Sequence, residues 1–183
     1  MPASYPNVPV LAFVGFSGSG KTTFLEKLIQ LLSRDGINLA LIKHAHHEFD
    51  IDIPGKDSYR LRHAGASQVM VASRKRRALI IETPSAVADP VLDDCLAEID
   101  SRDLDLILIE GFKHADVRKI EIHRNETQQD LLYPDDENII ALVTDNASGL
   151  AHQSTQNIPV FDINTPQGMI EFIVNYMNNN SSS

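Results

Sequence analysis

Eight residues near the N-terminus constrain the fold of this chain more than any other segment. Gly15 to Thr22 read GFSGSGKT and match the spacing G-x-x-x-x-G-K-[ST]. A short apolar run, Val10 to Val14, precedes them, and apolar residues recur at helical spacing from Thr22 to Ser33. A glycine-rich turn between a buried strand and an amphipathic helix is typical of a loop that binds nucleotide phosphates. The structural alternative is a Gly/Ser turn that only caps the helix.

The residue types in this loop suit phosphate binding. Glycines adopt positive φ and let backbone N–H groups approach an anion without a Cβ in between. Together with the helix N-terminus, these groups present donors and positive partial charge. We expect Lys21 to reach the β and γ phosphates, Thr22 to ligate Mg²⁺ and Thr23 to hold the α phosphate. The predicted nucleotide-binding residues of the loop are Gly15, Ser17, Gly18, Ser19, Gly20, Lys21, Thr22 and Thr23.

The rest of the chain alternates between strand-like and helix-like segments. Strands separated by helices over this length favour a three-layer α/β fold with a mainly parallel sheet flanked by helices. The predicted strands lie at 10–14, 39–42, 104–109, 120–123, 139–143 and 160–163, and further predicted helices at 89–100 and 165–177.

Two further apolar runs, 69–72 and 78–81, flank Ser73 to Arg77 and predict an added β-hairpin. We expect antiparallel pairing in this hairpin and at the strand 120–123. The pattern as a whole predicts a single domain over residues 8–177, with disordered ends at 1–7 and 178–183.

Composition limits the classes of partner that this protein can bind and indicates its cellular compartment. Of the 183 residues 43% are hydrophobic, and the formal net charge is -9. General nucleic-acid or acidic-membrane binders usually carry the opposite sign, so we expect neither partner. No apolar run approaches the ~18 residues of a membrane-spanning helix, and the first residues do not read as a secretory signal. A single cysteine, Cys95, allows no internal disulfide and fits a reducing cytoplasm.

A carboxylate follows the apolar run near the middle of the chain, which reads LDLILIEG from Leu104 to Gly111. Because ligands of such folds bind at the carboxyl ends of the strands, Glu110 is delivered to the edge where the phosphate loop lies. We expect Glu110 to bind Mg²⁺ through a water or to order the attacking water, and Asp105, at the other end, to be a solvent-facing cap. A purely structural carboxylate is the alternative for Glu110.

The segment after the second predicted strand is rich in histidine and carboxylate. Lys43 to Asp52 read KHAHHEFDID. His44, His46 and His47 lack the i, i+4 spacing of a helical zinc pair, so phosphate or substrate contact is favoured over a metal site or a solvated loop. Asp50 or Asp52 is a candidate for a second carboxylate on the Mg²⁺ side.

Next along the chain, PGKDSYR covers residues 54–60. Lys56 and Asp57 there mark either a second anion site or an ordinary capped helix start.

These motifs together resemble the molybdopterin-guanine dinucleotide biosynthesis adaptor family, MobB. The likeness spans residues 10–125 in the family's order and spacing, and is weaker beyond. It rests on GFSGSGKTT (15–23), LIKHAHH (41–47), DIPGKDSYR (52–60), AGA (64–66), ETP (82–84) and LDLILIEGFKH (104–114).

The resemblance implies a cytoplasmic GTP-binding homodimer with weak GTPase activity, acting mainly as an accessory protein. Its implied partner is the MobA guanylyltransferase, which attaches GMP to molybdopterin. Carried over residue by residue, the loop with Lys21 holds GTP and Mg²⁺, and Glu110 and Gly111 lie beside the γ phosphate. The same resemblance implies a neighbouring groove that binds a second anion or the pterin phosphate. The residues implied to line it are His44, His46, His47, Lys56 and Asp57.

No N-K-x-D or T-K-x-D box is present to read guanine. Asp145, after a late strand, can accept hydrogen bonds from guanine N1 and N2, but no lysine follows Thr144, so selectivity for GTP over ATP rests on the resemblance.

Two other functions stay open. A small-molecule kinase shares the loop, with Arg74 to Arg77 as a substitute for its lid arginine, and a metal carrier would use His44, His46 and His47. The basic run is equally a partner contact or a solvated turn.

Overall fold

The computed structural model describes residues 7–45, 49–85, 88–150 and 158–180. They divide into two compact units, the first comprising the chain up to His44 and from Val91 onward, the second Ala45–Pro90. Each unit has its own sheet. The expectation of one domain over 8–177 stays a prediction.

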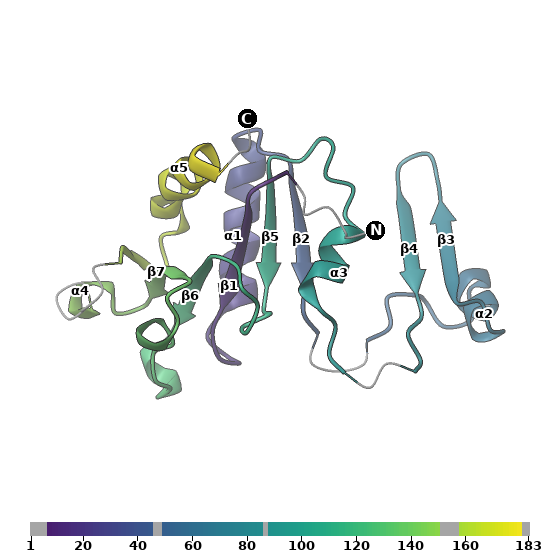
Figure 1. Cartoon of the computed structure of the whole chain (residues 1–183), viewed down its shortest axis with the longest axis horizontal. Helices are drawn as coiled ribbons and strands as arrows, with labels where there is room; N and C mark the ends of the chain where they lie inside the picture. Colours follow the sequence, from purple (N-terminus) through teal and green to yellow (C-terminus); the bar gives the residue numbers. More distant parts are fainter. Residues whose placement is uncertain (1–6, 46–48, 86–87, 151–157, 181–183) are drawn as a thin grey trace. The chain divides into compact units, whose positions relative to one another are not determined.

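The first unit contains a six-stranded sheet in which every neighbouring pair is parallel, in the order β2-β5-β1-β6-β7-β8 (Figure 1). This confirms the three-layer α/β fold with a mainly parallel sheet. The strands are β1 (Val10–Val14), β2 (Leu39–Lys43), β5 (Leu106–Glu110), β6 (Lys119–His123), β7 (Ile139–Thr144) and β8 (Val160–Asp162).

The expectation of antiparallel pairing at 120–123 is wrong, because β6 runs parallel to both β1 and β7. The connection from β5 to β6 contains no helix. Residues 111–118 are nevertheless long enough to return the chain to the edge of the sheet at which the parallel strands begin. Eight extended residues span about 26 Å, more than the ~17 Å of a five-residue strand. Near its end this segment is tied to the sheet where the Ala12 N–H donates to Arg118 O at 3.0 Å.

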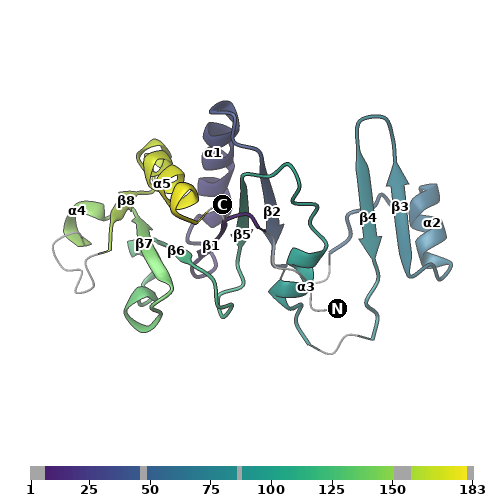
Figure 2. The ribbon, with the colours of Figure 1, turned by 45° about the horizontal axis from the view of Figure 1, so that its top comes forward.

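Helices and loops bury both faces of the central strands β5, β1 and β6 of this sheet. Leu11 and Phe13 of β1 face a core formed with α1 (Lys21–Arg34) and α5 (Ile170–Asn180), which lie on the same face (Figure 2). Val10, Ala12 and Val14 alternate to the opposite face, where α3 (Leu92–Ala97) covers them. Because successive residues of a strand point to opposite faces and both faces are buried here, the strands read as continuous apolar runs. Four short elements complete the unit: η1 (Asn125–Thr127), η2 (Tyr133–Asp135), α4 (Ala147–Leu150) and η3 (Pro166–Met169).

Two helices differ in length from their prediction. The helix expected at 89–100 is only α3, because Val91 is still extended (φ -86°, ψ 135°) and Asp100 turns its carboxylate to Arg102. The last helix, predicted at 165–177, begins at Ile170 after the 3-10 turn η3 and continues to Asn180, whose side-chain amide donates to Tyr176 O at 2.8 Å. None of the helices in the described ranges is long and apolar enough to cross a membrane.

The second unit consists of α2 (Asp57–His63) and the hairpin β3 (Gln68–Ala72) to β4 (Arg77–Ile81), which confirms the predicted hairpin (Figure 1). Its turn lacks glycine and asparagine because Ser73 closes it. The Ser73 N–H donates to Arg76 O at 2.8 Å, and Ser73 Oγ accepts the N–H of Arg76 at 3.1 Å. A serine hydroxyl thus does the work usually done by a residue with positive φ.

Apolar side chains of this hairpin are exposed. Register pairs Met70 with Leu79 and Gln68 with Ile81, so Met70, Leu79 and Ile81 share one face, and each is at least 40% exposed. No described residue of the second unit is buried. A two-stranded hairpin is marginal without a covered face.

Candidate functional site

The predicted phosphate loop joins the carboxyl end of β1 to the first turn of α1. Its glycines adopt φ values that other residues rarely do: +146° at Gly15, +81° at Gly18 and +87° at Gly20. A Cβ on Gly15 would lie 2.2 Å from the carbonyl oxygen of Ile122 in β6, and one on Gly20 would lie 3.1 Å from Arg124 Nε. Glycine at 15 is therefore required by the close approach of β6 as well as by φ, whereas glycine at 20 is favoured by its positive φ.

Lys21 folds over this loop. Its ammonium donates to the carbonyl oxygens of Gly15 (2.9 Å) and Phe16 (2.8 Å). Burial lowers the pKa of Lys21, although nearby Glu110 opposes that shift. Of the other loop residues, Ser17, Gly18, Thr22 and Thr23 are exposed, whereas Ser19 is buried. The loop thus offers an ammonium beside a set of exposed positions at the start of a helix, the arrangement expected for an anion site.

Glu110 ends β5 next to this loop, as predicted. The Thr22 hydroxyl donates to Glu110 Oε1 at 2.7 Å, and Lys43 Nζ lies 2.6 Å from the same oxygen. Burial raises the pKa of Glu110, but the hydrogen bonds from Lys43 and Thr22 outweigh it, so the pKa is lowered overall. Asp105, at the other end of the strand, accepts the Asn38 N–H, which confirms its reading as a cap.

His44 and Gly111 meet beside Glu110. The His44 N–H donates to Glu110 O at 2.9 Å, and the His44 ring stacks on Phe112 with centroids 4.6 Å apart. A Cβ on Gly111, where φ is +97°, would lie 2.9 Å from the Cβ of His44. The predicted partners His46 and His47 lie outside the described residues. Among the residues that the structure describes, no three His, Cys, Asp or Glu side chains gather as a metal site would require.

Asp145 follows β7 and is exposed. Its Oδ1 accepts the N–H of Asn125, the first residue after Arg124, at 3.0 Å. The carboxylate expected to read guanine therefore also anchors the turn that follows β6.

The remaining predicted residues, Asp52, Lys56 and Asp57, belong to the second unit. Asp52 Oδ1 accepts the Ser58 hydroxyl and the Ile53 N–H, both at 3.0 Å, while its buried Oδ2 has no hydrogen-bond partner among the described residues. Lys56 is the extended residue that precedes α2, and no side chain caps that helix at this position. Asp57 is exposed in its first turn.

Sequence reasoning missed three cations at the loop. Lys43 was part of a quoted motif, but only the pairing of β2 with β5 sets it opposite Glu110. Lys113 Nζ lies 4.7 Å from the centre of the Phe16 ring, and Arg124 packs against Gly20. No spacing rule signals these contacts, since they depend on which strands are neighbours. The basic run Arg74–Arg77 lies at the exposed hairpin turn.

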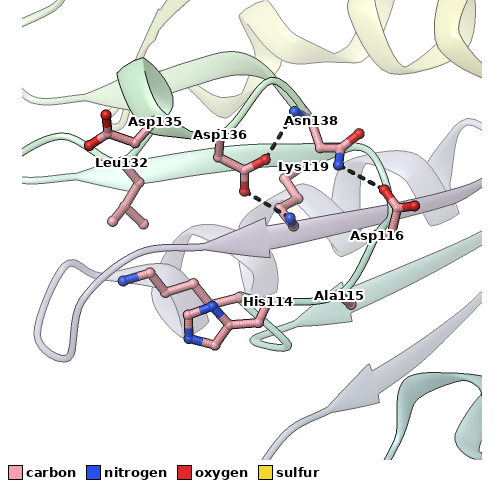
Figure 3. A pocket seen from close by; sticks show the side chains of 9 residues that line it. His114, Ala115, Asp116, Lys119, Leu132, Asp135, Asp136 and Asn138 are labelled. Carbon is pink, nitrogen blue, oxygen red and sulfur yellow. Dashed lines mark hydrogen bonds and ion pairs between the residues drawn. The ribbon is translucent and has the colours of Figure 1, made fainter.

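A cavity of about 480 Å³ lies beside Lys113, one of the cations at the loop (Figure 3). Buried Lys119 points to Asp136, with Nζ–Oδ2 at 2.8 Å, and Asn138 donates to Asp116 at 2.9 Å. Burial raises the pKa of Asp136, but the Lys119 hydrogen bond leads the contacts that lower it overall. These polar groups satisfy one another, so the cavity walls are held together by their own pairs. Its lining residues are Lys113, His114, Ala115, Asp116, Lys119, Leu132, Asp135, Asp136 and Asn138.

Several known proteins are similar to this chain in sequence and in fold. The chain is 43% identical over 173 residues to the molybdopterin-guanine dinucleotide biosynthesis adapter protein of Escherichia coli, covering 93% of this chain and 94% of that protein. It is 39% identical to the protein of the same name from Haemophilus influenzae, covering 93% and 90%. The crystal structure of Bacillus subtilis MobB matches with a TM-score of 0.67 at 27% identity, covering 92% of this chain and 97% of that chain.

The family model described as molybdopterin guanine dinucleotide synthesis protein B matches residues 10–145. That range holds the predicted phosphate loop, Glu110 and Asp145. The chain therefore belongs to the MobB family.

Proposed function

We propose that this chain is a GTP-binding adaptor of molybdenum cofactor biosynthesis. It binds GTP and Mg²⁺ at the phosphate loop, hydrolyses GTP slowly, and assists the MobA guanylyltransferase in attaching GMP to molybdopterin in the cytoplasm. The geometry of the loop, with Lys21 folded over it at the N-terminus of α1, carries the nucleotide part of the proposal. Family membership and the names of the relatives support the part that concerns the pathway.

Charge around the loop supports the binding of a polyphosphate. The chain has a formal net charge of -9, yet four cations lie at or beside the loop. Lys21 and Lys43 flank Glu110, with Lys43 2.6 Å from its carboxylate. Lys113 lies over Phe16 and Arg124 against Gly20. A local cationic cluster in an acidic protein concentrates anions at that place.

The loop also fits a nucleotide-bound Mg²⁺. Such an ion takes one or two protein ligands and completes its shell with phosphates and waters, so a cluster of three protein ligands is not needed. Thr22 Oγ1 and Glu110 Oε1 are 2.7 Å apart, which suits a hydroxyl ligand beside a carboxylate that binds through water. Asp52 stays a candidate for the second carboxylate on the Mg²⁺ side, on the ground of its place in the sequence. When bound, Mg²⁺ neutralises negative charge on the phosphates.

Slow hydrolysis follows from the state of Glu110. A general base works best when its pKa is near the working pH. The pKa of Glu110 is lowered, and its Oε1 already accepts bonds from Thr22 and Lys43. In this proposal Lys21 stabilises charge on the transferred phosphoryl group, while Glu110 orders the attacking water and withdraws its proton poorly.

Asp145 is the proposed reader of guanine. It is exposed at the end of β7, and its bond to the Asn125 N–H fixes the carboxylate as an acceptor. A carboxylate can accept both N1–H and N2–H of guanine, whereas adenine presents no such pair of donors. The names of the relatives, which refer to guanine dinucleotide synthesis, favour the same base.

The pterin site is proposed beside the γ-phosphate end. His44, stacked on Phe112 and bonded to the Glu110 backbone, provides one flat wall. Glycine at 111 lets this ring approach. The resemblance to the family, not the structure, assigns His46, His47, Lys56 and Asp57 to the binding of the pterin phosphate or another anion.

A homodimer is proposed through the hairpin of the second unit. Met70, Leu79 and Ile81 present an apolar face on β3 and β4 that remains exposed. Pairing with the same face of a second copy would cover it, because a two-fold interface joins identical patches.

Reconstitution with purified MobA, molybdopterin and Mg·GTP tests the adaptor proposal. The rate of guanine dinucleotide formation should rise on adding this protein and should not rise with Lys21→Ala. Lys27→Ala, which removes an exposed lysine of the same helix, is the matched control and should behave as wild type. Full assistance by Lys21→Ala would show that nucleotide binding is not part of the role.

The same purified components distinguish the adaptor function from that of a small-molecule kinase. Phosphate release from GTP should be much slower than the ~1 per second at the lower end of kinase turnover. Phosphoryl transfer to molybdopterin at or above that rate would contradict the adaptor proposal.

A further inference from the structure

Arg124 lies against the phosphate loop on the side away from Glu110. It follows β6, the strand next to β1. A Cβ built on Gly20 would lie 3.1 Å from Arg124 Nε and 3.4 Å from Nη2. The guanidinium therefore packs directly on the residue that precedes α1, next to the position that a Cβ of residue 20 would occupy.

The backbone of Arg124 is fixed on both sides of this contact. Its carbonyl oxygen accepts the Thr127 hydroxyl at 2.7 Å and the Thr127 N–H at 3.1 Å. The next residue, Asn125, donates its N–H to Asp145 Oδ1 at 3.0 Å. Gln128 closes the turn with φ +51°, a conformation uncommon for a residue that is not glycine. The turn after β6 is thus a built feature that aims Arg124 at the loop.

The charge of Arg124 is poorly compensated by the described residues. Its one ion pair with a described residue joins Nη1 to Glu126 Oε1 at 3.7 Å, longer than a hydrogen bond, and the Glu126 side chain is 73% exposed. No hydrogen bond links the guanidinium to another described residue. A guanidinium is always charged and has five N–H donors, a good match for phosphate oxygens.

Glu110 and Arg124 lie on opposite sides of the loop, and this indicates which phosphate each of them meets. Glu110 and Lys43 lie on the side of β5, where Glu110 accepts the Thr22 hydroxyl and the γ phosphate is expected. Arg124 follows β6, on the other side of β1, and lies beside Gly20; its neighbour in the chain contacts Asp145, the proposed reader of the base. The α phosphate lies between the base and the β phosphate of any purine nucleotide.

We propose that Arg124 is a nucleotide-contacting residue, whose guanidinium binds the α phosphate of a purine nucleoside triphosphate. This inference rests on the nucleotide binding proposed above and adds a cation that the phosphate-loop motif does not contain. Because the α phosphate is common to GTP and ATP, Arg124 supplies affinity without selecting the base.

Equilibrium titrations of the full chain with Mg·GTP and Mg·ATP test this role. Arg124→Gln should weaken both nucleotides by the same factor, about 10- to 100-fold for loss of a charge-assisted hydrogen bond. Arg124→Lys should recover most of that loss, since it restores the charge. Arg34→Gln, which removes an exposed arginine at the far end of α1, is the matched control and should bind as wild type.

Each other outcome overturns the assignment. Unchanged affinity in Arg124→Gln, with wild type still binding, would remove Arg124 from the site and leave the proposed function standing. A changed ratio of GTP to ATP affinity would make Arg124 a base reader. Equal losses in the Gln and Lys variants, together with a lower midpoint of thermal unfolding, would mean a structural role. Failure of wild type itself to bind either nucleotide would overturn the proposed function and this inference together.

Discussion

Gly15→Ala tests whether the loop is shaped by its approach to β6. The alanine Cβ would lie 2.2 Å from the carbonyl oxygen of Ile122, where an ordinary C···O contact is about 3.3 Å, so backbone must move by about 1 Å. The φ of +146° adds strain for any residue with a Cβ. Gly18→Ala is the matched control, because φ there is also positive (+81°) but no atom lies within 4 Å of the added carbon.

The two variants should differ by the cost of the clash. Positive φ costs about 1–3 kcal/mol, and forced backbone movement costs about 1–3 kcal/mol more. We therefore expect Gly15→Ala to lower the free energy of unfolding by about 4 kcal/mol and Gly18→Ala by about half as much. Such a difference moves the midpoint of thermal unfolding by roughly 5 °C in a chain of this size.

Urea unfolding followed by circular dichroism, without nucleotide, measures both values. The slope of free energy against urea should be the same in wild type and both variants, so that the midpoints report stability alone. Equal losses in the two variants would refute the reasoning, because the clash with Ile122 would then contribute nothing.

The remaining predictions concern other parts of the chain. Glu110 has a lowered pKa, so the stability advantage of wild type over Glu110→Gln should be full above its ordinary value of 4.5 and vanish as pH falls through the lowered one. Burial raises the pKa of Glu121, so its advantage over Glu121→Gln should be full below 4.5 and shrink as pH rises through the raised value. Urea titrations from pH 3.5 to 8 check both predictions. If the free energy of unfolding of each variant changed with pH in the same way as that of wild type, the predictions would be contradicted. Ser73→Ala should speed exchange of the Arg76 amide about fivefold by hydrogen-exchange mass spectrometry, since a bond of ~1 kcal/mol is lost. An unchanged rate would mean that the hydroxyl does not hold the turn. Leu79→Glu should convert the proposed dimer to a monomer in light scattering; a persistent dimer would place the interface elsewhere.

Local chemistry made much of the first unit predictable. The apolar runs and the spacing from Gly15 to Lys21 specify a strand, a turn and a helix without reference to distant residues. The direction of β6 was mispredicted, because nothing in residues 111–118 indicates how far that segment travels before pairing. Parallel partners are chosen by tertiary packing, which the sequence pattern does not encode.

The candidate site was likewise predictable only where local sequence places a residue. Glu110 follows from the rule that parallel strands deliver side chains to one edge. Lys43 and Arg124 do not, since each acts through a neighbour that is distant in sequence: Glu110 for Lys43 and Gly20 for Arg124. The length of α3 also escaped prediction, because an extended Val91 ends a pattern that composition alone would continue.

Isothermal titration calorimetry with Mg·GTP, on wild type and on Lys21→Ala, tests the central claim that this loop holds a nucleotide. We predict saturable heat with wild type and with Lys27→Ala, and none with Lys21→Ala at the same concentrations. Binding to folded Lys21→Ala as tight as to wild type, or no heat from wild type with either GTP or ATP, would contradict the account.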